Sequence, residues 1–327
     1  MVGVETFLYY LSKLYDFVVY YKEGDPEQVK RLSKNVEVHK YTKPIECDRF
    51  FCNYGYDIEV KAKEYYHIIH YDPLNVGFTP MINPEFKYIG VSKVACKGWK
   101  EKTGLDIELI YNPLPVEKVE VEKYQDNKIH LISATRLTSE KGLGRMQQLA
   151  RLLEENKIDY EWVVYTNRQR KPIGRNAIYK EQKLDITPEI AKADFLVQLS
   201  DCESYGYTVA ESLVQNTPVI ITPLEAFKEI GCIHGVNAII CDFSMKQVDL
   251  SMIKEKSLKF DYKPIKDGWG KYLPTERTYN PNELIEVECL KTITFIEEGK
   301  KCRIHEITKI TRARASYLEA KGYVKCI

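Results

Sequence analysis

The stretch Glu203-Ser-Tyr-Gly-Tyr-Thr-Val-Ala-Glu211 decides the fold, because it places two carboxylates eight positions apart around a glycine. An apolar run at 193–200 has the pattern of a buried strand, residues 208–215 have that of a first helical turn, and 218–221 form the next strand. Free N–H groups at a helix start attract phosphate, whereas carboxylates accept hydrogen bonds from sugar hydroxyls. The pattern predicts a sugar-nucleotide site at a strand-to-helix turn.

A simpler reading of the same stretch remains open. In that reading Glu203 caps the helix, and Glu211 is a solvated acid in its first turn, where negative charge is favourable. The segment alone does not decide between the two interpretations.

A second cluster lies earlier in the chain. Residues 128–134 have the pattern of a buried strand, and they are followed by Arg136, the pair Lys141-Gly142 and an amphipathic stretch at 143–153. Two cations at the C-terminal end of a strand can stabilise a diphosphate that gains charge as a glycosidic bond breaks. The alternative is that each cation is an ordinary solvated surface charge.

Taken in this order and at about this separation, the two clusters resemble the donor half of retaining glycosyltransferases of family 4. The opening Gly3-Val-Glu5 resembles the glycine-rich loop of that family, and Tyr88–Ser92 followed by Ile110–Pro113 resembles a later strand and turn. The resemblance covers roughly residues 1–245. It implies the GT-B fold, in which two Rossmann-like, doubly wound domains face each other across a cleft, and a transfer reaction that uses no metal ion or other cofactor.

The resemblance also implies roles for individual residues. Arg136 and Lys141 would neutralise the diphosphate, and Glu203 would accept hydrogen bonds from the sugar. His70, at the end of an apolar strand, would orient sugar or acceptor, with His67 as the competing position and a purely structural histidine as the alternative. The other implied donor-binding residues are Gly3, Tyr205, Gly206, Tyr207, Glu211 (to ribose hydroxyls) and Glu229, and the implied acceptor residues are Asn53, Tyr54 and Asp72.

Two departures from the family pattern stand out. The chain begins at the glycine-rich loop, so we expect the first domain to lack the strand that usually precedes it, whether natively or because the sequence starts late. At 223–230 the family prefers two glycines before Pro-Glu, and here Glu229 can take the place of that glutamate. Without the glycines, backbone N–H groups approach a ligand less closely.

Apolar runs alternating with helical stretches predict two α/β domains followed by an appendage. We place the acceptor domain at 1–115, the nucleotide-sugar domain at 116–262, and a crossover remnant with a small α+β module at 263–327. Residues 113–126 have the character of an interdomain linker. The predicted strands lie at 17–21, 36–39, 49–52, 67–70, 88–91, 108–111, 129–134, 161–165, 195–197, 219–221 and 238–241.

The C-terminal segment differs in charge from the rest. Residues 263–327 contain 13 Lys and Arg against 9 Asp and Glu, although the whole chain has a net charge of +1. A basic surface can bind nucleic acid or an anionic membrane, and a solvated face is the alternative. The segment weakly resembles small modules of phage structural and accessory proteins. Its cations from 300 onward are Lys300, Lys301, Arg303, Lys309, Arg312, Arg314, Lys321 and Lys325.

Composition limits the setting of the protein. The chain has 327 residues, which suits two domains, and its nine cysteines are scattered without the spacing of a zinc site. We therefore expect reduced thiols in the cytoplasm. We expect no signal peptide, and these residues contain no apolar run long enough to span a bilayer.

Several functions fit these patterns. The leading one is a retaining transferase that moves a hexose from a nucleoside diphosphate sugar, with UDP-glucose as the favoured type, to an acceptor hydroxyl. Alternatives are a phage enzyme that glycosylates a DNA base, a nucleotide-sugar epimerase, and a sugar-nucleotide-binding protein without turnover. The acceptor and the oligomeric state are not predicted.

Overall fold

The computed structural model describes residues 3–53, 58–76, 80–167, 172–291, 293–295, 300–303 and 305–326. These residues fall into two compact units, each of which is assembled from separate chain segments. The first unit contains the described residues 51–53 and 66–267, and the second contains 3–50, 58–65 and 268–326.

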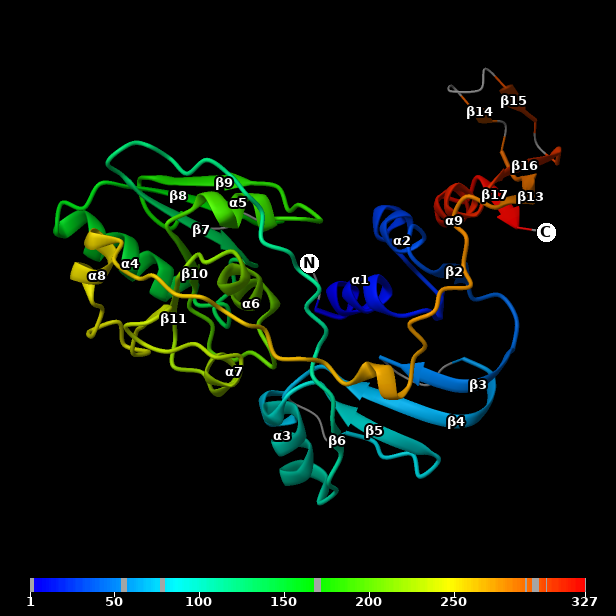
Figure 1. Ribbon diagram of the computed structural model, residues 1–327, viewed down its shortest axis with the longest axis horizontal. Coiled ribbons are helices and arrows are strands. Elements are labelled where there is room, and N and C mark those ends of the chain that lie inside the picture. Colours follow the sequence, from blue (N-terminus) through cyan, green and yellow to red (C-terminus); the bar gives the residue numbers. More distant parts are fainter. Residues whose placement is uncertain are drawn as a thin grey trace. The chain divides into compact units, whose positions relative to one another are not determined.

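A six-stranded parallel sheet forms the centre of the first unit (Figure 1). Short apolar runs rich in β-branched residues form its strands, as expected for strands buried on both faces. The strand order is β12-β11-β10-β7-β8-β9. The first of these strands in the sequence, β7, is therefore central, with β8 and β9 added on one side of it and β10, β11 and β12 on the other. The strands are β7 (Ile129–Ala134), β8 (Tyr160–Tyr165), β9 (Ala177–Lys180), β10 (Phe195–Gln198), β11 (Val219–Ile221) and β12 (Ala238–Ile240).

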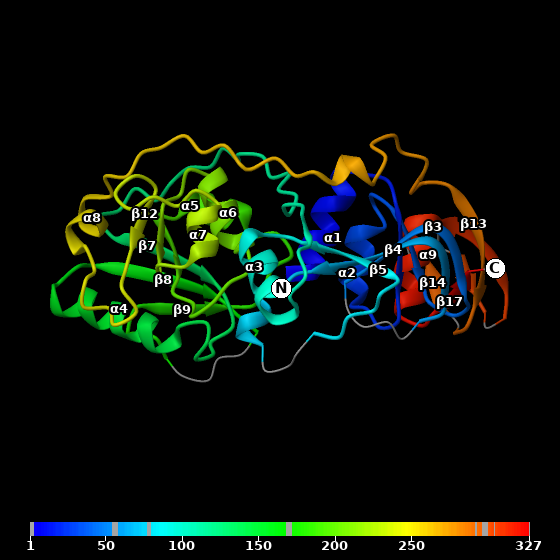
Figure 2. The same cartoon turned by 90° about the horizontal axis from the view of Figure 1, so that it is seen from below.

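Helices cover both faces of this sheet (Figures 1 and 2). Alternate residues of β7, β8 and β10 pack with Met146, Leu149 and Leu153 of α4 in one buried cluster, to which Ile253 of α8 also belongs. The other face carries α5 and α6. The helices of this part are α4 (Leu143–Glu155), α5 (Thr187–Lys192), α6 (Tyr207–Val214), α7 (Glu225–Glu229) and α8 (Leu250–Glu255).

The earlier part of the chain forms two further sheets. One has four strands in the order β3-β4-β5-β6, and the other is a parallel pair, β1-β2. Helix α3 begins where the Ser92 hydroxyl accepts a hydrogen bond from the Ala95 N–H and ends at Gly104, whose φ of 77° is left-handed. The elements are α1 (Gly3–Leu14), β1 (Val18–Tyr21), α2 (Pro26–Leu32), β2 (Glu37–Lys40), β3 (Ile45–Cys52), β4 (Val60–Ile69), η1 (Pro73–Asn75), β5 (Phe86–Gly90), α3 (Lys93–Thr103) and β6 (Glu108–Leu109).

The segment that follows the first unit attaches to helix α1 within the second unit. Trp269, in the short helix η2 (Trp269–Lys271), is fully buried and meets the Phe7 ring edge-on, with 5.2 Å between ring centroids. The Arg277 guanidinium donates hydrogen bonds to the carbonyls of Ser12 and Lys13 at the end of α1. These carbonyls have no partner within their own helix, so Arg277 stabilises its C-terminus.

The C-terminal module is a three-stranded antiparallel sheet, β16-β13-β17, with one helix packed on it. Val287, Ile310 and Val324 from the sheet pack against Ala315 of α9, and all four are buried. Its elements are β13 (Leu284–Cys289), β14 (Ile293–Phe295), β15 (Lys300–Cys302), β16 (Ile307–Thr311), α9 (Arg312–Ala320) and β17 (Val324–Cys326).

The predicted fold class and most predicted strands are confirmed, but several details were not foreseen. Strand β9 was missed, because Ala177–Lys180 alternates between partly buried and exposed residues at the sheet edge. β1 and β2 form a sheet of their own rather than part of a larger one. Cys302 is disulfide-bonded, so the expectation that every thiol is reduced is wrong. The predicted domain boundaries stay predictions.

We predict that Trp269→Ala lowers the free energy of unfolding by about 3–5 kcal/mol, the usual cost of removing a large buried aromatic side chain. The reason is the cavity left beside Phe7. Urea unfolding followed by circular dichroism measures the change. Tyr20→Ala is the control, because the Tyr20 side chain is 44% exposed. Equal losses in the two variants would contradict the prediction.

Candidate functional site

The two clusters predicted from the sequence lie together at one edge of the six-stranded sheet. Strands β7 and β10 are parallel neighbours, so their C-terminal ends reach the same edge. The loop after β7 carries Lys141, and the loop after β10 carries Glu203. The Lys141 Nζ lies 2.7 Å from Glu203 Oε1, and the side chains are 19% and 17% exposed.

Close backbone packing holds these two loops against each other. Gly142 has φ 80°, and a Cβ at this position would lie 1.8 Å from the Leu199 carbonyl oxygen. The Asp201 N–H donates to the Glu140 carbonyl at 2.9 Å. Arg145, from the first turn of α4, donates to the Leu199 carbonyl at 2.8 Å and pairs with Asp201 at 2.5 Å. The position of Glu203 relative to Lys141 is therefore set by the backbone.

Glu203 is held by uncharged donors as well as by Lys141. Its Oε1 accepts hydrogen bonds from the Ser200 hydroxyl at 2.8 Å and from the Gln198 amide at 3.1 Å. Helix α6 has Gly206 at its N-cap and no side-chain capping bond, so Glu203 does not cap the helix. Of the two interpretations, the structure excludes the helix cap.

A left-handed glycine and two tyrosines form the start of α6. Gly206 has φ 89°, a conformation that favours glycine, and it packs on Phe227. Beside it, the Tyr205 and Tyr207 rings meet edge-on with 5.0 Å between centroids. Burial first, and then the charges of Tyr262, Glu211 and Glu229, raise the pKa of Tyr205. Glu211 is only 4% exposed, so it is not a solvated acid.

Arg136 does not take part in the Lys141–Glu203 ion pair. Its side chain is 60% exposed, and its guanidinium lies 3.5 Å from the Glu140 carboxylate. The nearby Thr138 hydroxyl, aided by the charges of Arg136 and Lys141, lowers the pKa of Glu140. The two predicted cations therefore flank one acid, but only Lys141 contacts Glu203.

Glu229 is engaged with a neighbouring helix. Its Oε1 accepts a hydrogen bond of 2.6 Å from the backbone N–H of Lys93, the first residue of α3. Burial is the main reason why the pKa of Tyr111 is raised to about 12, and the charge of Glu229 and a hydrogen bond to it contribute less. A role for Glu229 in donor binding stays a prediction.

Of the predicted acceptor residues, Asn53 lies beside the predicted catalytic residue His70, just after the ends of β3 and β4. The His70 Nε2 lies 2.7 Å from the Asn53 amide oxygen. Burial first, and then His67, lowers the pKa of His70 to about 3, so the ring is neutral near pH 7. Because the Asn53 amide oxygen can only accept, the neutral ring donates to it through Nε2.

Asp72 has a local structural role, because its carboxylate accepts hydrogen bonds from the Leu74 N–H at 3.0 Å and from the Asn75 amide at 2.6 Å. The pKa of Cys202 is raised, mainly by burial. The charges of Glu203, Asp201 and Asp72 raise it further, whereas the charge of Lys141 lowers it. Asp72 therefore lies within electrostatic range of the loop that carries Glu203.

Two predicted residues are not placed in this site. Tyr54 lies outside the described residues. Gly3 is the first residue of α1 and belongs to the second unit. Both stay predictions.

Three site residues were missed from the sequence: Gln198, Ser200 and Arg145. Gln198 and Ser200 are polar residues at the end of an otherwise apolar strand, and this pattern could have indicated a hydrogen-bonded site. Arg145 carried no such signal, because a cation in an amphipathic helix is usually solvated.

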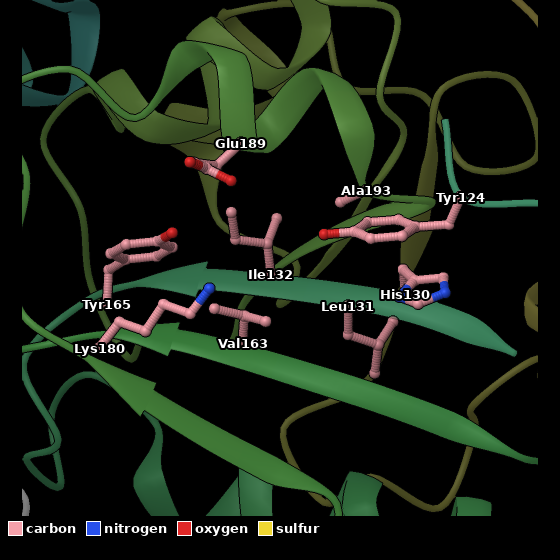
Figure 3. A pocket seen from close by; sticks show the side chains of 9 residues that line it. All are labelled: Tyr124, His130, Leu131, Ile132, Val163, Tyr165, Lys180, Glu189 and Ala193. Atoms are coloured by element: carbon pink, nitrogen blue, oxygen red, sulfur yellow. The ribbon is translucent and has the colours of Figure 1, made fainter. Parts of the chain in front are cut away.

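A small hollow lies on the α5 face of the same sheet (Figure 3). Lys180, Tyr165 and Glu189 surround one end, and Tyr124 and His130 the other. Its free volume of about 20 Å³ is enough for one water, whereas pockets for small molecules measure roughly 300–1,000 Å³. This hollow is not a nucleotide site.

Two other features were sought in the described residues. They contain no group of three or more His, Cys, Asp or Glu side chains that could hold a metal ion. None of the helices in those ranges is both long and apolar enough to cross a membrane.

No protein-family model and no curated protein sequence matches this chain. Solved structures do match it. HepE from Anabaena, in complex with UDP-glucose, is 14% identical with a TM-score of 0.58, and the match covers 78% of this chain and 86% of HepE. A glycosyltransferase from Rickettsia africae ESF-5 is 13% identical with a TM-score of 0.54, and the match covers 78% and 89% of the two chains.

A third match is partial. TarM is 11% identical with a TM-score of 0.49, and the match covers 76% of this chain but 51% of TarM, so this chain spans about half its length. At such identities the likeness to HepE and to the Rickettsia protein shows the fold. This chain has the α/β architecture of the GT-B fold.

We predict that Gly142→Ala destabilises the protein by about 1–2 kcal/mol for the left-handed backbone plus about 1–3 kcal/mol for overpacking against Leu199. Gly104→Ala is the matched control, because Gly104 has φ 77° but no atom within 4 Å of the added Cβ. Urea unfolding of both variants gives the comparison. Equal destabilisation would show that Gly142 does not need the close approach.

A second prediction concerns His67 and His70. Burial lowers the pKa of His67 to about 4, and that of His70 is about 3. Because the unfolded chain binds protons near pH 6.5 and the native rings do not, these histidines should favour folding fully above that pH and progressively less below it. NMR titration of the imidazole Cε1–H signals should find both rings neutral at pH 5.5. Titration of either near pH 6.5 would contradict this.

Proposed function

We propose that this protein is a retaining glycosyltransferase that moves a hexose from a nucleoside diphosphate sugar, preferably a UDP-sugar, to an acceptor hydroxyl without a metal ion. The observation that carries the proposal is the Lys141–Glu203 ion pair at adjacent strand ends, beside the left-handed Gly206 that starts α6. The GT-B fold shared with HepE, which was crystallised with UDP-glucose, supports the same class of donor.

Each residue would contribute one interaction with the donor. The Lys141 ammonium and the Arg136 guanidinium would offset the negative charge of the diphosphate as the glycosidic bond breaks. N–H groups at the start of α6 would add further positive potential. Glu203 would accept hydrogen bonds from the sugar, and Glu211 from the ribose. Retention would not use the pair of carboxylates typical of retaining hydrolases.

The acceptor would approach from the His70 side. Because the leaving diphosphate and the incoming hydroxyl would share one face of the sugar, the departing phosphate itself can take the acceptor's proton. His70, held by Asn53 at 2.7 Å, would orient a hydroxyl of the sugar or the acceptor. We place this reaction in the cytoplasm.

No observation favours the alternative in which the basic C-terminal module docks on DNA. Arg312 pairs with Glu37 at 2.8 Å and with Glu283 at 2.6 Å, and Lys309 lies 3.5 Å from Glu286. These cations are already partly neutralised within the protein. If the module binds DNA, the affinity must fall steeply with salt.

We predict that Lys141→Ala and Arg136→Ala each lower turnover by about 10²-fold or more, the scale for losing one charge-stabilising donor. Release of nucleoside diphosphate from UDP-, GDP- and ADP-sugars, with and without candidate acceptors, measures turnover. Arg151→Ala is the matched control, because Arg151 is an exposed cation of α4. We expect it to keep wild-type turnover.

The same assay separates the candidate functions. Release that depends on an acceptor supports transfer, an isomerised sugar supports epimerisation, and binding without turnover supports a binding protein. Wild-type turnover in both Lys141→Ala and Arg136→Ala would refute the assigned roles.

A further inference from the structure

The Glu203 carboxylate has more hydrogen-bond donors than a simple ion pair requires. One oxygen, Oε1, accepts from the Lys141 ammonium, the Ser200 hydroxyl and the Gln198 amide, at 2.7, 2.8 and 3.1 Å. The Gln198 amide also donates to the Ser200 hydroxyl at 2.7 Å, so the two neutral side chains form one network. All three donors point at the same atom.

Both neutral donors are held rigidly. Ser200 is fully buried and Gln198 is 7% exposed. The Ser200 carbonyl accepts a hydrogen bond of 2.6 Å from the Thr222 hydroxyl, which follows β11. Gln198 is the last residue of β10. Their geometry is therefore fixed by the sheet rather than by the ligand.

Other buried hydroxyls of this sheet behave differently. The Ser133 hydroxyl donates to the Val197 carbonyl, and the Thr217 hydroxyl donates to the Ile190 carbonyl. These groups satisfy the main chain, which is the usual role of a buried hydroxyl. The Ser200 hydroxyl instead donates to a carboxylate at the edge of the sheet.

A bound diphosphate would be a second anionic partner for the Lys141 ammonium. A diphosphate carries more negative charge than one carboxylate, so it competes with Glu203 for the ammonium. Glu203 is only 17% exposed, and a charge left unpaired in such a place costs free energy. Donors that remain on Oε1 would reduce this cost.

We propose that Gln198 and Ser200 are positioning residues that hold the Glu203 carboxylate in place while Lys141 moves from the carboxylate to the diphosphate of the donor. This inference rests on the proposed function. The ion pair then holds the Lys141 ammonium ready for the ligand, and the neutral donors remain on Glu203 when Lys141 moves away. Glu203 keeps its second oxygen for the sugar.

The proposed movement of Lys141 from Glu203 to the diphosphate predicts how substitutions change the affinity for UDP. Without the neutral donors, Glu203 depends on Lys141 alone and holds it more strongly, so Gln198→Leu with Ser200→Ala should weaken UDP binding about tenfold or more. Glu203→Gln releases Lys141 and should strengthen UDP binding. In the Glu203→Gln background, the two further substitutions should change the affinity less than about twofold, because no carboxylate competes.

The test is this cycle of four proteins, measured by isothermal titration calorimetry with UDP, with GDP and, separately, with inorganic pyrophosphate. UDP lacks the sugar, so lost contacts between Glu203 and the sugar do not enter. Circular dichroism melts monitor folding, and Ser200→Cys, which is close to serine in volume, replaces the double substitution if that variant does not fold. Ser133→Ala is the matched control, because Ser133 is also fully buried. It should lose stability but bind UDP within about twofold of wild type.

The outcomes are distinct. An equal loss of affinity in the wild-type and Glu203→Gln backgrounds would show that Gln198 and Ser200 act only through folding, and would overturn the inference. Pyrophosphate binding without binding of UDP or GDP would refute the proposed function, and the pyrophosphate cycle would still decide the exchange. If the wild type binds neither UDP, GDP nor pyrophosphate, both proposals fall.

Discussion

The ion pair between Lys141 and Glu203 is the interaction on which the site depends, and it exists because β7 and β10 are parallel neighbours. Parallel strands bring the loops at their C-terminal ends to one edge, and Gly142 allows the loops to touch. A side chain at position 142 would force them apart. The backbone therefore sets the charge arrangement before any ligand binds.

The two sides of the first unit differ in their electrostatics. At the proposed donor side, a carboxylate and an ammonium lie 2.7 Å apart with neutral hydrogen-bond donors around them, so the two charges offset each other. At the proposed acceptor side, burial keeps His70 neutral, and its Nε2 lies 2.7 Å from the Asn53 amide oxygen. This division suits a reaction in which a diphosphate leaves and an uncharged hydroxyl arrives. The charge of Asp72, felt at Cys202, places the two sides within electrostatic range.

Local patterns predicted much of the fold. The β-branched runs of β7, β10 and β11 and the amphipathic α4 were visible, because period and composition are local properties. A small α+β module was also expected in the C-terminal segment, and the structure has a three-stranded sheet with one helix there. Strand β9 was not seen, because an edge strand with exposed alternate residues resembles a loop. The disulfide at Cys302 was not seen either, because the pairing of cysteines depends on the folded chain.

The sequence by itself determined which residues lie in the loops after β7 and β10, since strand ends and turn glycines are encoded over a few neighbouring positions. Only the tertiary structure decided that Lys141 rather than Arg136 pairs with Glu203, that Gln198 and Ser200 share the same carboxylate oxygen, and that Glu229 bonds to the start of α3. Those partnerships join residues far apart in the chain or depend on the direction of single side chains. Strand order brings the distant residues together, and close packing sets the direction of the side chains. Neither strand order nor close packing produces a periodic pattern in the sequence.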